Sequence, residues 1–447
     1  MKIIIVGAYA IGTHLAKLLS RNDHDTVLID SDFERLSNIS SDYDLMTLLA
    51  SNSRISTFKE AGVSHADLFI AVTPDEDFNM TSCMLAKALG AKRTVAKIDH
   101  NEFLDPKLKT HFENVGITSL IYPEKLAAVD IANGLKMSWV RQRWDVHDGA
   151  LIMLGIKLRE TAEILDQPLK DLCKPESPYH IVAIKRGKET IIPRGDDVLQ
   201  LKDIAYFMTT RQYIPYIRSI VGKERYADVK NVIIMGGGAT AVRATALMPE
   251  YMKVKIIEAD EARCEKLNEL IDTDRVMVIH GDGRDLALLN EEGIKNTQAF
   301  VALTGNAETN ILACLTAKRL GVRKTVAMVE NFDYVSMAES LDLGTIINKK
   351  ALAASYIYQM MLDADVNNTR FLMSINTDIA EFVAQPGSKI TRKKVFELGL
   401  PKGATIGGLV RNGEGYLVNG DTQVQEGDSV VVFCYNIDLT KLEKFFN

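Results

Sequence analysis

The stretch KIIIVGAYAIG at residues 2–12 carries most of the information about the fold, and NVIIMGGGATA at residues 231–241 repeats its pattern. In each stretch a short apolar run leads into a glycine-bearing turn and then into an amphipathic segment. An uninterrupted apolar run of this length is typical of a strand that is buried on both faces of a parallel sheet. The two stretches therefore predict two openings of a nucleotide-binding β-α-β unit.

The similarity extends beyond the two turns. The first glycines, Gly7 and Gly236, lie 229 residues apart, and the threonines that follow a later strand, Thr73 and Thr304, lie 231 residues apart. A nearly constant offset over several elements indicates that a whole module is duplicated.

Strands alternate with helices in each copy, and a β-rich segment with turn signals follows each copy. The sequence therefore predicts an α/β chain in which a Rossmann-like, doubly wound parallel sheet domain and a small α+β domain occur twice in tandem. A long amphipathic helix is expected near the end of each parallel domain, at Glu124 to Arg141 and Lys350 to Asp363. The predicted boundaries are 1–140, 141–225, 226–366 and 367–447.

Composition excludes several classes of protein. The chain has 447 residues, a net charge of −6 and a pI near 5.9, which argues against non-specific nucleic-acid binding because that function needs a basic surface. No apolar run is long enough to suggest a membrane span. The start of the chain is interpreted as the first strand of a mature cytoplasmic protein.

The cysteines and histidines do not have the spacing of a disulfide framework or of a metal site. The five cysteines are widely spaced and never form Cys-x-x-Cys, and the histidines form no His-Glu-x-x-His pairing. We therefore expect reduced cysteines in the core and no metal site.

The second turn matches a dinucleotide fingerprint. Gly236 and Gly238 take the places of the tight turn and of the close approach to pyrophosphate, and Ala241 is the small third residue. Glu258, which ends the next strand, is placed to accept hydrogen bonds from ribose hydroxyls.

A later loop and a strand end add candidates to this copy. Gly281, Asp282 and Gly283 follow the third strand, where they are expected to let the loop approach an adenosine, and Thr304 ends a strand at the ligand-binding edge. The corresponding residues of the first copy, 50–52, are Ala-Ser-Asn.

The first copy keeps Gly7, Gly12, Asp30 and Thr73, but Tyr9 stands where a glycine normally admits the phosphates. We therefore expect unequal sites, and leave open whether the first one binds a ligand. In both copies the acid would repel a 2′-phosphate, so NAD(H), ADP or ATP is favoured over NADP(H).

Two further motifs suggest a family. The segments AGV at residues 61–63 with ADLFIAVT at 66–73, and IVAIKRG at 181–187 with IIPRGDD at 191–197, resemble the RCK (regulator of potassium conductance) family. The resemblance covers essentially the whole chain, and the tandem order of domains carries it as much as the motifs do.

The resemblance implies a function. Members of the family form rings of RCK units beneath a potassium-conducting membrane protein, here one of the TrkH type, and bound nucleotide changes the shape of the ring to gate the pore. The chain would then be a homotetrameric regulatory subunit, cytoplasmic and peripheral on the inner face of the membrane. By position the resemblance places the nucleotide contacts on the glycines, acids and threonines named above.

Two other functions compete with this one. An NAD-dependent oxidoreductase would need an acid-base group beside the nicotinamide, and only His180 in the small domains is an obvious candidate, so we expect no enzyme. A nucleotide-sensing scaffold without a membrane partner is the other alternative.

Overall fold

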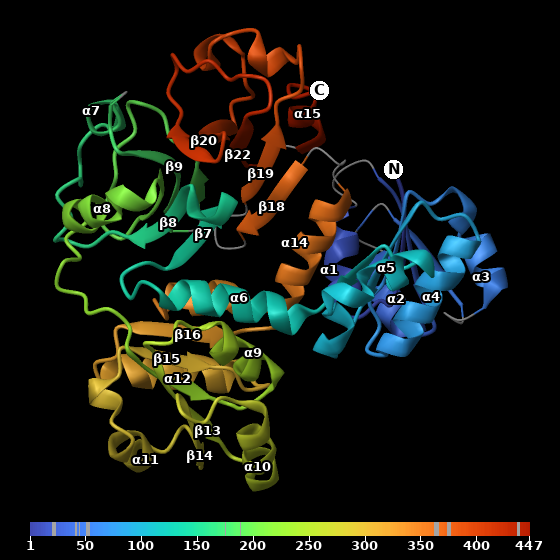
Figure 1. Ribbon diagram of the computed structural model, residues 1–447, viewed down its shortest axis with the longest axis horizontal. Helices are drawn as coiled ribbons and strands as arrows, with labels where there is room; N and C mark the ends of the chain where they lie inside the picture. The colour runs from blue at the N-terminus through green and yellow to red at the C-terminus, as the bar shows by residue number, and fades with distance from the viewer. Residues whose placement is uncertain are drawn as a thin grey trace. The chain divides into compact units, whose positions relative to one another are not determined.

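Four sheets organise the chain (Figure 1). The computed structural model describes residues 1–19, 24–40, 43, 45–50, 54–174, 176–187, 189–361, 366–372, 377–435 and 439–447. Two of the sheets are six-stranded and parallel, and two are five-stranded and antiparallel.

The first parallel sheet has the strand order β3-β2-β1-β4-β5-β6. Strands β2 and β3 are added on one side of β1 and strands β4 to β6 on the other, so the strand order reverses beside β1. Ligands of such sheets bind at the carboxyl ends of the strands next to this reversal. The strands are β1 (Lys2–Val6), β2 (Asp25–Asp30), β3 (Met46–Leu49), β4 (Leu68–Ala71), β5 (Arg93–Lys97) and β6 (Ser119–Ile121). The helices are α1 (Ala10–Leu19), α2 (Phe33–Ser40), α3 (Ile55–Glu60), α4 (Glu76–Ala88), α5 (Lys109–Asn114) and α6 (Pro123–Leu135).

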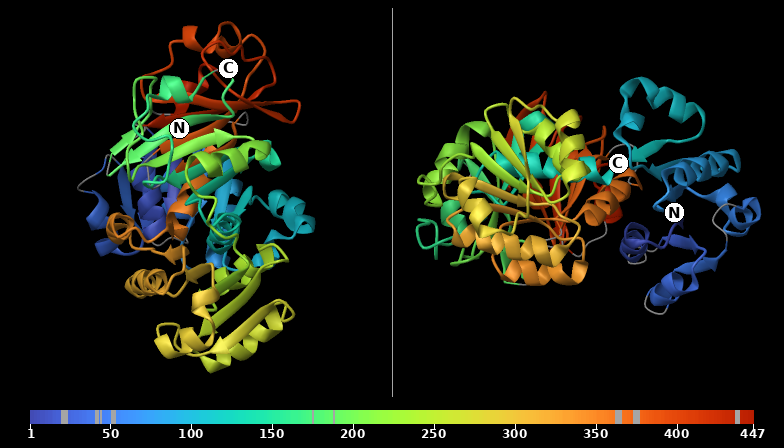
Figure 2. Two further views of the ribbon diagram at one scale, coloured as in Figure 1. Left: turned by 90° about the vertical axis from the view of Figure 1, so that its left-hand side faces the viewer. Right: turned by 90° about the horizontal axis from the view of Figure 1, so that it is seen from below.

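The second parallel sheet repeats this order as β14-β13-β12-β15-β16-β17, with helices on both of its faces (Figure 2). The strands are β12 (Asn231–Met235), β13 (Lys253–Glu258), β14 (Val276–His280), β15 (Ala299–Ala302), β16 (Lys324–Met328) and β17 (Thr345–Ile347). The helices are α9 (Ala239–Leu247), α10 (Glu261–Leu270), α11 (Leu286–Glu291), α12 (Ala307–Arg319), α13 (Phe332–Ser340) and α14 (Lys349–Met361).

Burial explains why the apolar runs become central strands. Every residue of Ile3 to Val6 is fully buried, and Val232 to Met235 are nearly so. Strands covered by helices on both faces need apolar side chains on both, which a continuous run supplies.

The antiparallel sheets form the two small domains. The first has the order β10-β9-β11-β8-β7 and the second β18-β19-β22-β20-β21. The first contains β7 (Gln142–Val146), β8 (Leu151–Lys157), α7 (Leu169–Leu172), β9 (Tyr179–Arg186), β10 (Glu189–Ile191), β11 (Ile204–Thr209) and α8 (Ile214–Ile220). The second contains β18 (Val366–Leu372), β19 (Thr377–Val383), β20 (Ala404–Arg411), β21 (Glu414–Leu417), β22 (Ser429–Tyr435) and α15 (Leu439–Glu443).

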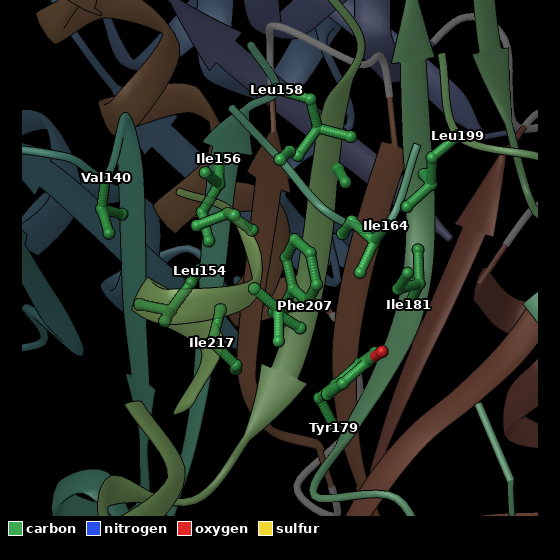
Figure 3. Packing of buried hydrophobic residues seen from close by; sticks show 14 of the residues in the cluster. Val140, Leu154, Ile156, Leu158, Ile164, Tyr179, Ile181, Leu199, Phe207 and Ile217 are labelled. Carbon is green, nitrogen blue, oxygen red and sulfur yellow. The ribbon is translucent and has the colours of Figure 1, made fainter. Parts of the chain in front are cut away.

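Each small sheet is held by apolar side chains. In the first, Leu154, Ile156 and Phe207 on one face of the sheet pack with Ile217 of α8 (Figure 3). The other face meets the second small domain, where Met153 and Val182 share a buried cluster with Phe433. The prediction of a duplicated parallel domain, each copy followed by a small α+β domain, is confirmed.

By compactness the chain groups into two units. The first consists of Met1–Leu126 with Lys349–Met361, and the second of Ala127–Asn348 with Leu362–Asn447. Within the first unit, α14 lies against α1 (Figure 1). This grouping does not follow the four predicted boundaries, which stay a prediction.

The first long helix is shorter than predicted. We expected it to run to Arg141, but α6 ends at Leu135. Beyond it, Ser138 Oγ donates to Ala227 O at 2.6 Å, Trp139 is buried in the first small domain, and Arg141 N donates to Gly155 O at 2.8 Å. Contacts with distant parts of the chain therefore override the local helical pattern. Of the second predicted helix, residues 362 and 363 lie outside the described residues.

The remaining expectations concern cysteines, metals and membranes. Cys83, Cys264, Cys314 and Cys434 are buried, and all five cysteines are reduced, with no disulfide between them. In the described part of the chain, no three His, Cys, Asp or Glu side chains gather as metal ligands. No described helix has the length and apolar character needed to cross a bilayer.

Candidate nucleotide-binding sites

The turn between β12 and α9 needs a glycine at its first position. Gly236 has a φ of +98°, a conformation that side-chain-bearing residues rarely adopt. A Cβ on Gly236 would lie 3.1 Å from both the carbonyl carbon of Leu303 and the amide nitrogen of Thr304. The absence of a side chain thus lets the turn lie directly against the end of β15.

The glycine two residues later is different. Gly238 has a φ of −69° and a ψ of 177°, which any residue can adopt, and a Cβ there would meet no heavy atom within 4 Å. Ala241, by contrast, is fully buried in the first turn of α9. Neither backbone conformation nor packing within the described residues requires a glycine at position 238.

Glu258 ties the end of β13 to this turn. The residue is 7% exposed; its Oε2 accepts a hydrogen bond from Gly237 N at 2.7 Å, and its Oε1 accepts one from Asp260 N at 3.0 Å. A carboxylate has about four lone-pair sites, so each oxygen keeps acceptor capacity for a hydroxyl group. Glu258 therefore stabilises the turn and can also accept from a ribose.

The loop after β14 has a more structural role than its sequence suggested. A Cβ on Gly283 would overlap the side chain of Met235, and one on Gly281 would lie 2.6 Å from Leu288 Cδ2. Asp282 pairs with Arg284, whose Nη2 lies 2.7 Å from Asp282 Oδ2, and these hydrogen bonds lower the pKa of Asp282. Packing against Met235 therefore favours glycine at position 283, the contact at position 281 involves only the end of the Leu288 side chain, and Asp282 is already bonded inside its own loop.

Thr304 belongs to a buried brace that sequence reasoning missed. Asn310 Oδ1 accepts from Thr304 N at 3.0 Å and from Thr304 Oγ1 at 2.7 Å, while its Nδ2 donates to Thr304 O and Met328 O at 2.9 Å each. The brace joins the carboxyl ends of β15 and β16 to α12. The first copy repeats it with Thr73 and Asn79. The recurrence of asparagine six residues after each threonine was the available signal.

The first turn has the same framework. Gly7 has a φ of +104°, and a Cβ on Gly12 would overlap the carbonyl oxygen of Gly7. Asp30, which is fully buried, accepts from Ala8 N at 2.7 Å through Oδ2 and from Asp32 N at 2.9 Å through Oδ1. The two sites thus share their turn, their acid and their brace.

An aromatic and a cationic side chain distinguish the first site. Arg35 Nη2 lies 2.8 Å from Asp30 Oδ1, Arg35 Nη1 lies 3.2 Å from Asp32 Oδ2, and the guanidinium lies over the Tyr9 ring at 4.2 Å. The hydrogen bond to Asp30 raises the pKa of Arg35, which is charged at any physiological pH. In this site Asp30 is already paired with Arg35, and Arg35 in turn lies over Tyr9, the residue that replaces glycine.

The second site lacks this arrangement. Its counterpart of Arg35 is Arg263, five residues after Glu258, and its counterpart of Tyr9 is Gly238. Among the described residues no cation forms an ion pair with Glu258, and Arg263 is exposed.

The predicted candidates of each copy gather at the carboxyl end of its parallel sheet. Of the first-copy loop at 50–52, residues 51 and 52 lie outside the described part.

Family models match most of the chain. The TrkA-N domain model matches residues 3–123 and 232–349, and the TrkA-C domain model matches residues 153–222 and 379–447. The chain belongs to the TrkA family.

Relatives with the TrkA name match along the whole length. The Trk system potassium uptake protein TrkA of Halomonas elongata is 30% identical over 440 residues, covering 97% of this chain and 95% of that protein. A TrkA homolog of Archaeoglobus fulgidus is 28% identical over 448 residues, covering all of both chains. The TrkA family resemblance therefore extends over all four sheets.

Solved structures with the same fold are RCK proteins. A GsuK channel bound to NAD has a TM-score of 0.62 at 15% identity, covering all of this chain and 78% of that one. The crystal structure of the GsuK RCK domain has a TM-score of 0.61 at 14% identity, covering all of this chain and 94% of that one. At this identity the likeness concerns the fold, and it confirms the predicted RCK architecture of this TrkA family member.

Proposed function

We propose that this chain is a nucleotide-binding regulatory subunit that gates a potassium-conducting membrane protein of the TrkH type. The observation that carries the nucleotide part is Gly238. It stands where backbone conformation and packing accept any residue, at the place where a dinucleotide fingerprint needs space for pyrophosphate. A ligand that occupies this space would account for the missing side chain.

The ligand is NAD(H), with ADP or ATP as alternatives. The amide groups at the start of α9 favour an anion, and Glu258 accepts from ribose hydroxyls while repelling a 2′-phosphate. The solved relative bound to NAD is consistent with this class of ligand. In our proposal Gly236, Gly238, Ala241, Glu258 and Thr304 surround the nucleotide, with Gly281 to Gly283 packed behind the turn.

The first site is the weaker one. A ligand there would have to displace Arg35 from Asp30 and move the Tyr9 ring. Both changes make the binding free energy less favourable than at the second site, which needs neither. Gly7, Gly12, Asp30 and Thr73 keep the framework, so this site is closed by side chains rather than by a different backbone.

Gating follows from assembly. We propose a cytoplasmic homotetramer that forms a ring of eight RCK units on the inner face of the membrane, bound there through its partner. A nucleotide can shift such a ring only if it binds one conformation more tightly, and a coupling of about 1–3 kcal/mol is usual. No catalytic step is part of this proposal. Burial lowers the pKa of His180 to about 4, which leaves that side chain neutral and packed.

Calorimetry on two matched variants tests the nucleotide part. Glu258→Ala should weaken NADH binding by roughly 10-fold to 100-fold, because it removes charged acceptors, whereas Asp30→Ala should change it little. Both acids bond a turn amide, so damage to the turn is common to the two variants and the difference reports the ligand. Equal losses would contradict unequal sites.

The partner part needs a separate measurement. Co-purification with a TrkH-type membrane protein supports gating, whereas failure to associate in every nucleotide state supports the scaffold alternative.

A further inference from the structure

Four cationic side chains in the second unit surround a single carboxylate. Lys157 Nζ lies 2.7 Å from Asp342 Oδ1, Arg159 Nη2 lies 2.6 Å from Asp342 Oδ2, and Lys318 Nζ lies 3.6 Å from the same oxygen. Arg141 forms an ion pair with Asp342 Oδ1. We call these five residues the Asp342 cluster. It joins the first small domain to the second parallel domain.

The cluster holds more positive charge than its carboxylate can balance. Glu339, a neighbouring acid, is already paired with Lys185 at 2.6 Å. Burial and the neighbouring cations lower the pKa of Arg141 to about 10 and that of Lys157 to about 7. Like charges held this closely repel one another unless another anion balances them.

The backbone at Asp342 adopts a left-handed conformation that favours glycine. Asp342 has a φ of 56°, and Gly116, which stands 226 residues earlier at the same place before the last strand of the first parallel sheet, has a φ of 97°. Aspartate is tolerated in this left-handed region but is less favourable than glycine. The second copy therefore carries a carboxylate at the place where the first copy has the residue best suited to this backbone.

Two of the cations have no charged counterpart in the second small domain. Lys157 and Arg159 correspond, at the same offset of 226 residues, to Val383 and Gln385 of the second small domain. The two copies therefore do not share these charges, which occur only in the small domain that meets Asp342.

The cluster is open to solvent on one side. The side chains of Arg159 and Lys318 are 42% and 30% exposed, whereas those of Arg141 and Lys157 are 16% and 18% exposed. Arg159 reaches Asp342 through Nη2, and the planar guanidinium has further N–H groups that suit the spacing of phosphate oxygens.

We propose that the Asp342 cluster binds a multivalent oxyanion of the phosphate class, which enters beside Arg159 and Lys318. The anion balances the excess charge and strengthens the attachment of the first small domain to the second parallel domain. This site is separate from the glycine turns and does not depend on the proposed nucleotide function.

The test is binding of inorganic phosphate to the full chain, measured by calorimetry and by thermal unfolding against chloride at equal ionic strength. Phosphate should bind and raise the unfolding midpoint. Arg159→Gln should weaken binding roughly tenfold, because a charged hydrogen-bond donor is lost. Asp342→Asn should strengthen binding, because it removes the competing internal anion while keeping a residue that tolerates the left-handed backbone.

Two controls accompany this test. Lys170→Gln removes an exposed lysine that pairs with Asp196, and it should leave phosphate binding unchanged. Adding ADP to Glu258→Ala and to Arg159→Gln distinguishes a free anion from a nucleotide phosphate, because ADP bound through the cluster is weakened by Arg159→Gln and not by Glu258→Ala. Asp342→Gly, which restores the residue of the first copy, replaces Asp342→Asn if that variant fails to fold. The proposal is overturned if Arg159→Gln binds phosphate like the unmodified chain, or if both Asp342 variants bind it more weakly.

Discussion

At the residue scale, two positions separate otherwise matching sites. Asp30 and Glu258 each end a second strand and each accept from the amide of the residue after the first glycine. In the first site Arg35 pairs with the acid and lies over Tyr9, whereas in the second site Gly238 leaves that space open. The two candidate sites therefore differ in their side chains on a shared backbone framework.

A reciprocal pair of substitutions tests the role of these two positions. Tyr9→Gly should release Arg35 and raise the number of NADH molecules bound per chain from one to two in calorimetry. Gly238→Tyr should abolish binding at the second site, and it should fold because position 238 has an ordinary extended backbone and nothing within 4 Å of its Cβ. A stoichiometry that neither substitution changes would show that Tyr9 does not close the first site.

At the element scale, the asparagine braces hold each sheet edge in register with the helix that covers it. Asn310 is fully buried and makes four hydrogen bonds that link α12 to the ends of β15 and β16. Buried backbone groups that lose their partner cost roughly 1–3 kcal/mol each. The brace therefore positions Thr304 at the candidate site.

Removing this brace should destabilise the second parallel domain. Asn310→Ala is expected to lower the free energy of unfolding by roughly 3 kcal/mol in urea titrations. The matched control is Asn306→Ala, which removes only the cap that accepts from Thr309 N at the start of α12, for about 1 kcal/mol. If the two variants lose the same stability, Asn310 acts as an ordinary helix residue.

At the scale of the whole molecule, buried cations mark the joint inside the second unit. Lys324 is 3% exposed, and its Nζ donates to Val140 O at 2.6 Å and to Thr345 Oγ1 at 3.0 Å. Burial, assisted by Arg141, lowers the pKa of Lys324 from 10.5 to about 7. The lysine thus links the segment after α6 to β17, and the same burial favours its neutral form.

This joint should make stability depend on pH. Between pH 7 and 10.5 the unfolded chain keeps the Lys324 proton that the folded chain has released, so the free energy of unfolding rises with pH across this window. The rise is on the order of a few kcal/mol. Lys324→Met, which keeps an apolar stem and carries no charge, should reduce this rise in urea titrations at pH 7, 8 and 9, while Lys157, whose pKa is also lowered to about 7, still contributes. A variant with the same slope as the unmodified chain would contradict the assignment.

Much of the architecture could be predicted because it depends on local patterns. Apolar runs, glycine turns and acidic strand ends recur at short spacing, and their duplication showed that two parallel domains are present. The errors arose where distant contacts decide. Trp139 and Val140 join the core of the small domain, so α6 ends at Leu135 rather than at Arg141. Met235, 48 residues before Gly283 in the sequence, packs against that glycine, a contact that the local pattern does not show.

The sequence by itself determined the family of folds and predicted the two candidate sites and their inequality, since Tyr9 and Gly238 differ at a position whose role is set by the turn. Only the tertiary structure revealed that Arg35 pairs with Asp30 and lies over Tyr9 in the first site, because side-chain positions depend on the folded chain. It alone also revealed the Asp342 cluster, whose members are up to 201 residues apart in sequence. Periodic patterns report contacts within one element, whereas charges and hydrogen bonds between elements exist only after the chain has brought them together.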